Sequence, residues 1–382
     1  MNEPVQQSVL QILNNAIESL GECGLQVAAY HQGELVVDAV AGIADPETGR
    51  RVEGDTPFLV FSCSKGITAT LVHRLYEAGL VDYDAPIAQY WPAFARHGKS
   101  GITVRDALTH RAGLPEIANV SWLDQWNLAD AGRELEGAST IWEPRSTLVY
   151  HPVTFGSILG NLVVRVTGQS FADAVKREIS ERVGVPDLKF GIDPSDVLRA
   201  SSRAVLISAR TPTPETGIAP PSRDETEQTE RMVMFGNDPR WIHGCMPGAN
   251  LTTSARALAR VYAALGPDGV DGMRLLRDET LSEAVRPSFG DDGASLSMGM
   301  GLGFQLGGMP ELSPTGHRLA PWRDAFGHDG AGGRVAMVSP RHRLAVALTK
   351  NAVTPGRYSL VTWRRVLETI SGSLGIAFEA ER

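Results

Sequence analysis

The sequence predicts an α/β fold of the α+β kind, with one antiparallel sheet assembled from both ends of the chain and flanked by helices. Three observations support this fold: a strand hairpin near the N-terminus, a second hairpin near the C-terminus, and a long, mostly helical middle. Strands kept to the two ends predict one sheet with helices packed on it, plus a mostly helical second lobe. A cleft between two such lobes is a usual place for a functional site.

The N-terminal hairpin is predicted from two apolar runs, Gly24–Tyr30 and Leu35–Val40, which are separated by a short glycine-containing turn. A further short apolar run covers Phe58–Phe61. A helix is then expected from Ser62, because apolar residues recur three or four positions apart until Gly79, where the helix should stop.

The middle of the chain is predicted to be helical, with one polar interruption. Apolar residues at helical spacing predict helices over Thr103–His110, Thr154–Thr167, Phe171–Val183 and Thr253–Leu265. The segment from residue 211 to 238 is rich in Pro, Thr, Glu and Asp, so we expect a long polar loop there.

The C-terminal part returns to strands and ends in a helix. Arg334–Val338 and Leu344–Leu348 form the second predicted hairpin, and Tyr358–Leu374 forms the final helix. We therefore expect a single unit over residues 1–382, divided into an α/β lobe (1–80 and 245–382) and a helical lobe (81–244).

Composition narrows the classes of function. The 382 residues carry Lys+Arg 36 against Asp+Glu 44, and a net charge of −8 argues against nucleic-acid binding, which needs a basic face. No run of about 18 apolar residues is present, so no membrane span is expected. Residues 1–7 lack the basic and apolar stretches of a secretory signal, so we expect a cytoplasmic protein.

The sequence indicates neither a metal nor a cofactor. Cys23, Cys63 and Cys245 are scattered and form no C-x-x-C pair, which argues against a disulfide framework and a structural zinc site. His243-Gly244-Cys245 offers two ligands without a partner pair, and a turn is the better interpretation. No phosphate-binding or dinucleotide-binding glycine motif opens a helix after a strand. The oligomeric state stays open.

A candidate nucleophile stands at the start of the first predicted helix. Ser62-Cys63-Ser64-Lys65 is an S-x-x-K pattern, whose spacing places the hydroxyl and the amine on one helix face. A desolvated lysine can take the proton that a serine must lose to become nucleophilic. About one such pattern is expected by chance in a chain of this length, and Ser62 could equally be a helix cap.

Two later motifs give the S-x-x-K pattern its meaning. Tyr150-His151-Pro152 precedes a predicted helix, and His328-Asp329-Gly330-Ala331-Gly332-Gly333 precedes a predicted strand. Serine, lysine, tyrosine and a late H-x-G stand in the order found in penicillin-recognising serine enzymes. Together with Val60–Gly66 and Thr103–Pro115, these motifs resemble the esterase branch of the serine β-lactamase-like superfamily, the family VIII carboxylesterases that share the class C β-lactamase fold. The resemblance runs over nearly the whole chain, from about Gly24.

The resemblance implies a role for each matching residue. Ser62 would attack the acyl carbonyl, while Lys65 and Tyr150 would together act as general base and later protonate the leaving group. The backbone N–H groups of Ser62 and Ala331 would form the oxyanion hole. Glycines beside Ala331 suit this role, because the chain must bring a bare N–H close to the substrate. The alternative for Tyr150 is a buried aromatic residue with a satisfied hydroxyl.

Two departures from the β-lactamase pattern shape the expected substrate. Pro152 stands where Y-x-N enzymes have asparagine, so His151 is the candidate substitute for substrate contact. The K-T-G triad becomes His328-Asp329-Gly330, which we also expect to contact substrate. A largely neutral histidine beside an aspartate would bind the carboxylate of a penicillin poorly.

The sequence therefore predicts a serine hydrolase that acts through a covalent acyl-enzyme on small carboxylic esters. One alternative is an acyltransferase that passes the acyl group from Ser62 to an alcohol or amine in natural-product biosynthesis. Weak β-lactamase or peptidase activity and a non-catalytic binding protein are further alternatives. The expected partner is a small ester or acyl substrate, and we expect the polar loop after Thr211 to cover the cleft and set acyl size.

Overall fold

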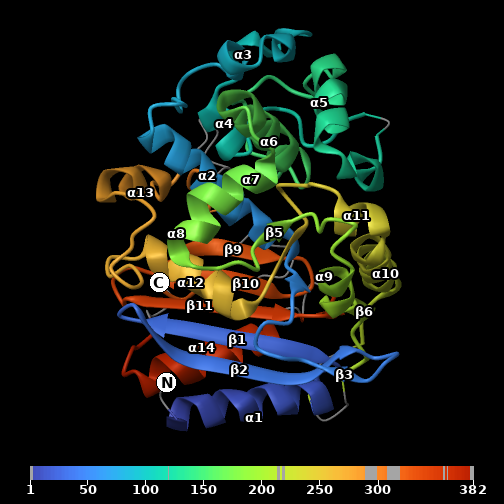
Figure 1. Cartoon of the computed structure of the whole chain (residues 1–382), viewed down its shortest axis with the longest axis vertical. Coiled ribbons are helices and arrows are strands. Elements are labelled where there is room, and N and C mark those ends of the chain that lie inside the picture. The colour runs from blue at the N-terminus through green and yellow to red at the C-terminus, as the bar shows by residue number, and fades with distance from the viewer. Residues whose placement is uncertain are drawn as a thin grey trace.

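The structure is a computed structural model that describes residues 3–118, 120–212, 216, 220–288, 299–307, 319–355, 358 and 360–378. Its centre is a seven-stranded antiparallel sheet in the order β3-β2-β1-β11-β10-β9-β8. The strands are β1 (Gly24–His31), β2 (Glu34–Asp45), β3 (Arg50–Arg51), β8 (Gln305–Leu306), β9 (Phe326–Gly330), β10 (Arg334–Ser339) and β11 (Leu344–Lys350). Val27 of β1 lies opposite Leu348 of β11, so both ends of the chain build one sheet, which confirms the predicted fold class (Figure 1).

Helices cover both faces of this sheet because its side chains alternate in direction. Val27, Val335 and Val346 belong to a core cluster with α1 (Glu3–Ser19) and α14 (Val361–Ser373). Their neighbours Ala28, Ala336 and Ala347 belong to the core on the opposite face, with α12 (Ala255–Leu265) and α2 (Ser64–Glu77). Helix α2 also packs on α6 (Thr154–Thr167), so its N-terminus lies where the sheet meets the helical part.

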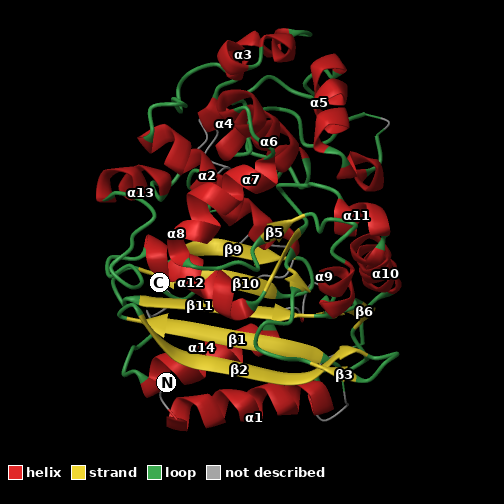
Figure 2. Cartoon of the chain, viewed as in Figure 1, coloured by secondary structure: helices red, strands yellow, loops and turns green. Residues whose placement is uncertain are grey.

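The helical part lies at the end of the molecule away from β1 and β2 (Figure 2). It comprises α3 (Ile87–Tyr90), α4 (Val104–Leu108), α5 (Leu128–Gly137), α6, α7 (Phe171–Val175) and α8 (Glu181–Val183). A π-helical turn, Lys176–Ser180, joins α7 to α8, so the helix predicted over Phe171–Val183 is continuous.

Short strands tie this part to the rest of the chain. In one small sheet, β7 (Leu251–Thr253) pairs with both β4 (Phe58–Leu59) and β5 (Lys189–Phe190). In another, β6 (Ile207–Ser208) pairs with β12 (Ala352–Val353). Two strands from within residues 81–244 thus pair with strands outside that range.

The prediction of a polar loop over residues 211–238 is wrong for most of its length. Helix α10 (Arg223–Asn237) occupies it, and α11 (Pro239–His243) follows directly. Ser222 accepts a hydrogen bond from the Glu225 N–H, and the Glu225 carboxylate accepts one from the Ser222 N–H. This capping box starts a helix whose composition is too polar to show an apolar period. Residues 213–215 and 217–219, in the proline-rich stretch before it, lie outside the described residues.

No helix is predicted from the sequence over residues 3–19, where α1 lies. Val5, Val9, Leu13 and Ala16 recur at helical spacing and are all buried, so this signal was present in the sequence. The remaining helices are α9 (Val197–Ser202) and α13 (Asp278–Ala284). Within the described ranges, no helix has both the length and the apolar composition needed to cross a bilayer.

Candidate active site

Ser62 stands in a tight turn that comes directly before α2. Residues Phe61–Cys63 form a 3₁₀ turn, and the backbone of Phe61 has φ +46°, a left-handed conformation that bulky residues rarely adopt. Ser64 donates to the Phe61 carbonyl and accepts from the Leu251 N–H at 3.0 Å, so β7 holds the turn in place. The turn leaves Ser62 partly exposed between two buried neighbours.

Lys65 is completely buried, and its amine contacts three oxygen atoms. Its Nζ lies 3.1 Å from Ser62 Oγ and 2.7 Å from each of the carbonyl oxygens of Pro152 and Gly248. Burial disfavours the ammonium form and lowers the pKa of Lys65 to about 7, against the nearby Asp329 carboxylate, which raises it. A substantial fraction of this side chain is therefore a neutral amine at neutral pH.

Two loops bring the carbonyl partners to Lys65. Pro152 lies just before α6, and the Gly248 loop packs directly against the first turn of that helix. A Cβ on Gly156 would lie 1.9 Å from the Gly248 nitrogen, so only glycine allows this approach. Thr68 of α2 donates to the Pro247 carbonyl at 2.6 Å and fixes the same loop. Sequence reasoning missed both partners, because backbone carbonyls leave no residue-type signal.

Tyr150 lies beside both residues. Lys65 Nζ lies 4.9 Å from its ring centroid, and the Ser62 hydroxyl is near enough to influence the pKa of the phenol. Burial raises the pKa of Tyr150 above its usual range, while the nearby Ser62 hydroxyl opposes this. The phenol is thus protonated at neutral pH. The structure brings Ser62, Lys65 and Tyr150 together.

His151 is predicted to contact substrate, but both of its ring nitrogens are bonded within the protein and neither is available for that contact. The side chain is buried, and its Nε2 accepts a hydrogen bond from the Leu114 N–H at 3.0 Å. Its Nδ1 therefore carries the proton and donates to the Val149 carbonyl at 2.5 Å. Both nitrogens serve the fold.

His110 explains why the Thr103–Pro115 segment matters at this site. Its Nδ1 accepts from the His151 N–H at 3.1 Å, and its ring centroid lies 4.8 Å from that of Tyr150. The Val149 N–H donates to the His110 carbonyl. Both residues next to Tyr150 are thus hydrogen-bonded to His110, which helps to hold the tyrosine in position.

The edge of β9 forms the other wall of the site. Cys63 Sγ contacts the His328 carbonyl at 3.2 Å, which ties β9 to the serine turn. Gly330 ends the strand, and Ala331 follows in the turn to β10. In the part of the chain that the structure describes, the Ala331 N–H has no hydrogen-bond acceptor. That N–H is free to meet a substrate oxygen, which is what an oxyanion hole requires.

His328 and Asp329 differ in exposure. The His328 ring is buried 6.2 Å from the Tyr150 ring, and burial lowers its pKa to about 3, so it is neutral. Its Nδ1 donates to the Asp329 carbonyl at 2.6 Å. The Asp329 side chain is 32% exposed. One of its carboxylate oxygens accepts a hydrogen bond of 2.8 Å from the Gln305 side-chain amide. Burial raises the pKa of Asp329, although Gln305 and Lys65 both oppose the rise.

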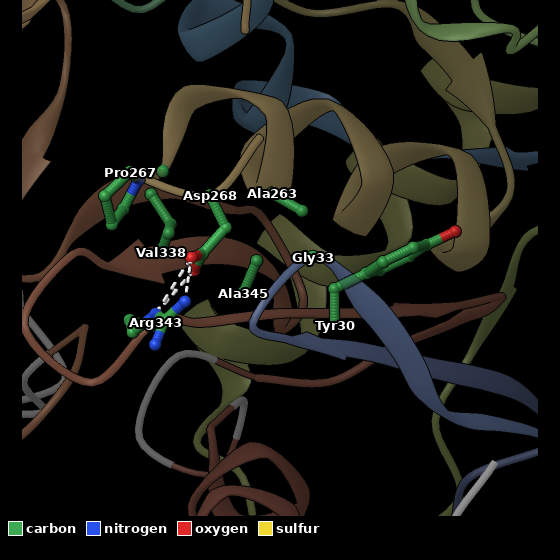
Figure 3. A pocket seen from close by; sticks show the side chains of 9 residues that line it. Tyr30, Gly33, Ala263, Pro267, Asp268, Val338, Arg343 and Ala345 are labelled. Atoms are coloured by element: carbon green, nitrogen blue, oxygen red, sulfur yellow. Dashed lines mark hydrogen bonds and ion pairs between the residues drawn. The ribbon is translucent and has the colours of Figure 1, made fainter. Parts of the chain in front are cut away.

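Besides a hollow along α1, two described cavities lie away from Ser62. One is a hollow of about 10 Å³ beneath the β1–β2 turn, where Asp268 and Arg343 form an ion pair (Figure 3). This volume holds no more than a single water molecule. A larger cavity of about 570 Å³ is lined by arginines that include Arg51 and Arg256. Neither cavity includes a residue of the serine cluster, so the site is identified by its chemistry rather than by its volume.

Comparisons with known proteins identify the family of the chain. The Beta-lactamase family model matches residues 13–370. The chain is 31% identical over 345 residues to the esterase/beta-lactamase LipL of Mycobacterium tuberculosis, covering 86% of this chain and 77% of LipL. It is 28% identical to esterase EstB of Burkholderia gladioli, over about half of each chain (47% and 50%). The crystal structure of a family VIII carboxylesterase superimposes with a TM-score of 0.79 at 27% identity over 97% of both chains. A penicillin-binding protein homologue from Caulobacter crescentus gives 0.78 at 26% identity, also over 97% of both chains. The chain therefore belongs to the beta-lactamase family.

Proposed function

We propose that this protein is a serine carboxylesterase that hydrolyses small carboxylic esters through an acyl-enzyme on Ser62. The observation that carries the proposal is the set of three contacts at Lys65 Nζ. A neutral amine has two N–H bonds and one lone pair. The Pro152 and Gly248 carbonyls accept the two N–H bonds, so the lone pair is directed at the Ser62 hydroxyl, 3.1 Å away.

This arrangement supports a definite order of proton transfers. Ser62 Oγ attacks the ester carbonyl carbon while its proton passes to Lys65 Nζ. The carbonyl oxygen gains the negative charge, which the N–H groups of Ser62 and Ala331 stabilise. As the intermediate collapses, the C–O bond to the alcohol breaks and the alkoxide takes a proton from the Tyr150 hydroxyl, which Lys65 reprotonates. The acyl group remains on Ser62.

Deacylation repeats these steps with water as the nucleophile. Water gives its proton through Tyr150 to Lys65, attacks the acyl carbonyl and releases the acid, and Ser62 Oγ recovers the proton. An alcohol or amine acceptor would give the transferase reaction instead. The described residues contain no feature that favours such an acceptor over water, so hydrolysis is the proposal.

Weak β-lactamase activity is the second candidate, since the name of LipL joins both activities. The residues at the end of β9 argue against efficient β-lactam hydrolysis. His328 is neutral and buried, and the neighbouring Asp329 carboxylate would repel the carboxylate of a penicillin. We expect ester turnover to exceed turnover of a chromogenic cephalosporin by more than about a hundredfold, since a lost charge contact and an added repulsion each cost on the order of tenfold.

We also propose a cytoplasmic location. Cys23, Cys63 and Cys245 are all free thiols. Disulfides are typical of proteins that work in oxidising compartments, so three unpaired cysteines favour a reducing one. Fractionation of the native host with an antibody against this protein would test the location.

The test of the esterase proposal is a burst assay with p-nitrophenyl butyrate, combined with intact-protein mass spectrometry. Wild-type protein should release p-nitrophenol in a burst of about one equivalent and gain one butyryl group. Ser62→Ala should show neither signal. Ser157→Ala is the matched control for a lost buried hydroxyl, because the Ser157 hydroxyl donates to the Val153 carbonyl at the start of its own helix α6, and this variant should still form the adduct.

Equal rates for wild type and Ser62→Ala, with no adduct on either, would contradict the proposal and favour the binding-protein alternative. Added methanol or an amine then separates hydrolysis from transfer. If the acid remains the main product as the acceptor concentration rises, water is the preferred acceptor.

A further inference from the structure

Arg334 is a buried cation placed directly beneath the proposed oxyanion turn. It is the first residue of β10, opposite Gly330 of β9, and its side chain is completely buried. Its Nη1 donates a hydrogen bond of 2.9 Å to the Ala331 carbonyl. Among the described residues, no aspartate or glutamate forms an ion pair with it, because the nearby Glu22 is bonded to Lys350.

The guanidinium remains charged in this setting. Burial lowers the pKa of Arg334 to about 10, which still leaves the group protonated at neutral pH. A buried charge without a carboxylate partner is costly, and only the contacts of the group itself offset that cost. Those contacts are with the two halves of the proposed oxyanion hole.

One contact fixes the turn after β9. Gly332 has φ +75°, and a Cβ there would lie 2.3 Å from Nη1 of Arg334, so the turn wraps closely around the guanidinium. The other contact fixes the serine turn. The guanidinium carbon lies 5.2 Å from the ring centroid of Phe61, the residue with the left-handed backbone that comes just before Ser62.

We propose that Arg334 is a positioning residue that holds the Ala331–Gly333 turn and the Phe61 ring together, and so sets the spacing between the N–H groups of Ser62 and Ala331. The inference rests on the proposed esterase function. Arg334 touches no reacting atom.

The test compares Arg334→Met with wild type in two measurements. The first is kcat and KM for p-nitrophenyl butyrate. The second is the inhibition constant of butylboronic acid, which forms a tetrahedral adduct with a reactive serine and needs the oxyanion hole. We expect kcat to fall about 10- to 100-fold with KM changed less than about threefold, and boronate affinity to fall by a similar factor.

Arg203→Met is the matched control. Arg203 is also buried, with 6% exposure and a pKa lowered to about 10 by burial, but it bonds Asn237 rather than the oxyanion turn. This variant should lose stability without losing boronate affinity or kcat at a temperature where it is folded. Arg334→Lys keeps the charge but lacks the planar fork, so it should recover only part of the lost rate. It carries the test if the methionine variant does not fold.

Three results would overturn the inference. They are an unchanged kcat in a folded Arg334 variant, a loss of kcat without a loss of boronate affinity, and an equal loss in Arg203→Met. Failure of the proposed function looks different, because wild-type protein would then neither hydrolyse the ester nor bind the boronate.

Discussion

Lys65 and Lys350 are both completely buried, yet they lie on opposite faces of the sheet in opposite surroundings. Lys350 ends β11 and forms an ion pair with Glu22 at 2.5 Å, and Thr354 adds a further contact at 2.8 Å. Among the described residues, the Lys65 amine has a hydroxyl and two carbonyls as its hydrogen-bond partners and no carboxylate. A buried lysine with a carboxylate partner is held as a cation, whereas one without is held near the point of losing its proton.

The difference separates a structural lysine from a reactive one. Burial lowers the pKa of both side chains, but Glu22 opposes the effect at Lys350 by charge and by hydrogen bond. At Lys65 the Asp329 carboxylate opposes the effect by charge alone, and the pKa there falls to about 7. Burial of Lys65 therefore keeps a larger fraction of its side chain as the free amine near neutral pH, the form that can accept a proton.

Replacing each lysine by methionine should give opposite phenotypes, and the largest effect is on catalysis. Lys65→Met removes the proposed base, so kcat/KM for p-nitrophenyl butyrate should fall about 10²- to 10⁴-fold. Lys350→Met should change it less than about threefold. Steady-state kinetics on both variants checks this. Comparable losses of kcat/KM in the two variants would contradict the distinction between a reactive and a structural lysine.

Stability should show the reverse order. Lys350→Met leaves the Glu22 carboxylate buried without its partner, so the free energy of unfolding should fall by about 3–5 kcal/mol. Adding Glu22→Gln should restore most of that loss, because the uncompensated charge is gone. Urea unfolding of the single and double variants measures both. A single variant as stable as wild type would show that the ion pair does not hold the fold.

The pH dependence of the wild-type enzyme sharpens the comparison. Lys65 accepts a proton only as the neutral amine, so kcat/KM should rise tenfold per pH unit at low pH and level off above about pH 7. With an ordinary lysine pKa of about 10.4, the rate would keep rising up to that pH. A rate profile from pH 5 to 10 distinguishes the two, and a limb near pH 10 would refute the lowered pKa.

The smallest expected effect concerns Asp329. Its carboxylate is the charge that most raises the pKa of Lys65, so Asp329→Asn should lower that pKa and move the rising limb to lower pH. Glu22→Gln is the matched control, because Glu22 faces Lys350. A rising limb that moves to higher pH in Asp329→Asn would contradict the assignment. A shift of the same size in Glu22→Gln would contradict it as well.

The elements that can be predicted from the sequence are those with a repeating pattern of residue types. Both hairpins and α6 follow from runs of apolar residues, and Ser62, Lys65 and Tyr150 follow from residue types in a recognisable order. The polar helix α10 could not be predicted in this way, because its start depends on the hydrogen bonds of Ser222 and Glu225 and few of its residues are buried.

Contacts made by the backbone were also beyond the sequence. The carbonyls of Pro152 and Gly248 decide the direction of the Lys65 lone pair, but any residue has a carbonyl. His151 stands beside Tyr150 in the chain and was therefore assigned to substrate, while the fold uses both its nitrogens internally. Arg334 follows a glycine-rich turn and reads as an ordinary strand residue until its burial is known.

The most direct test of the account is an NMR titration of Lys65 itself. The chain has five lysines (Lys65, Lys99, Lys176, Lys189 and Lys350), so protein labelled with ¹³C-lysine gives few signals, and the one missing from Lys65→Met is assigned. We predict that its Cε resonance titrates with a midpoint near pH 7. A Lys65 that stays protonated to pH 9 or above would contradict its role as the base.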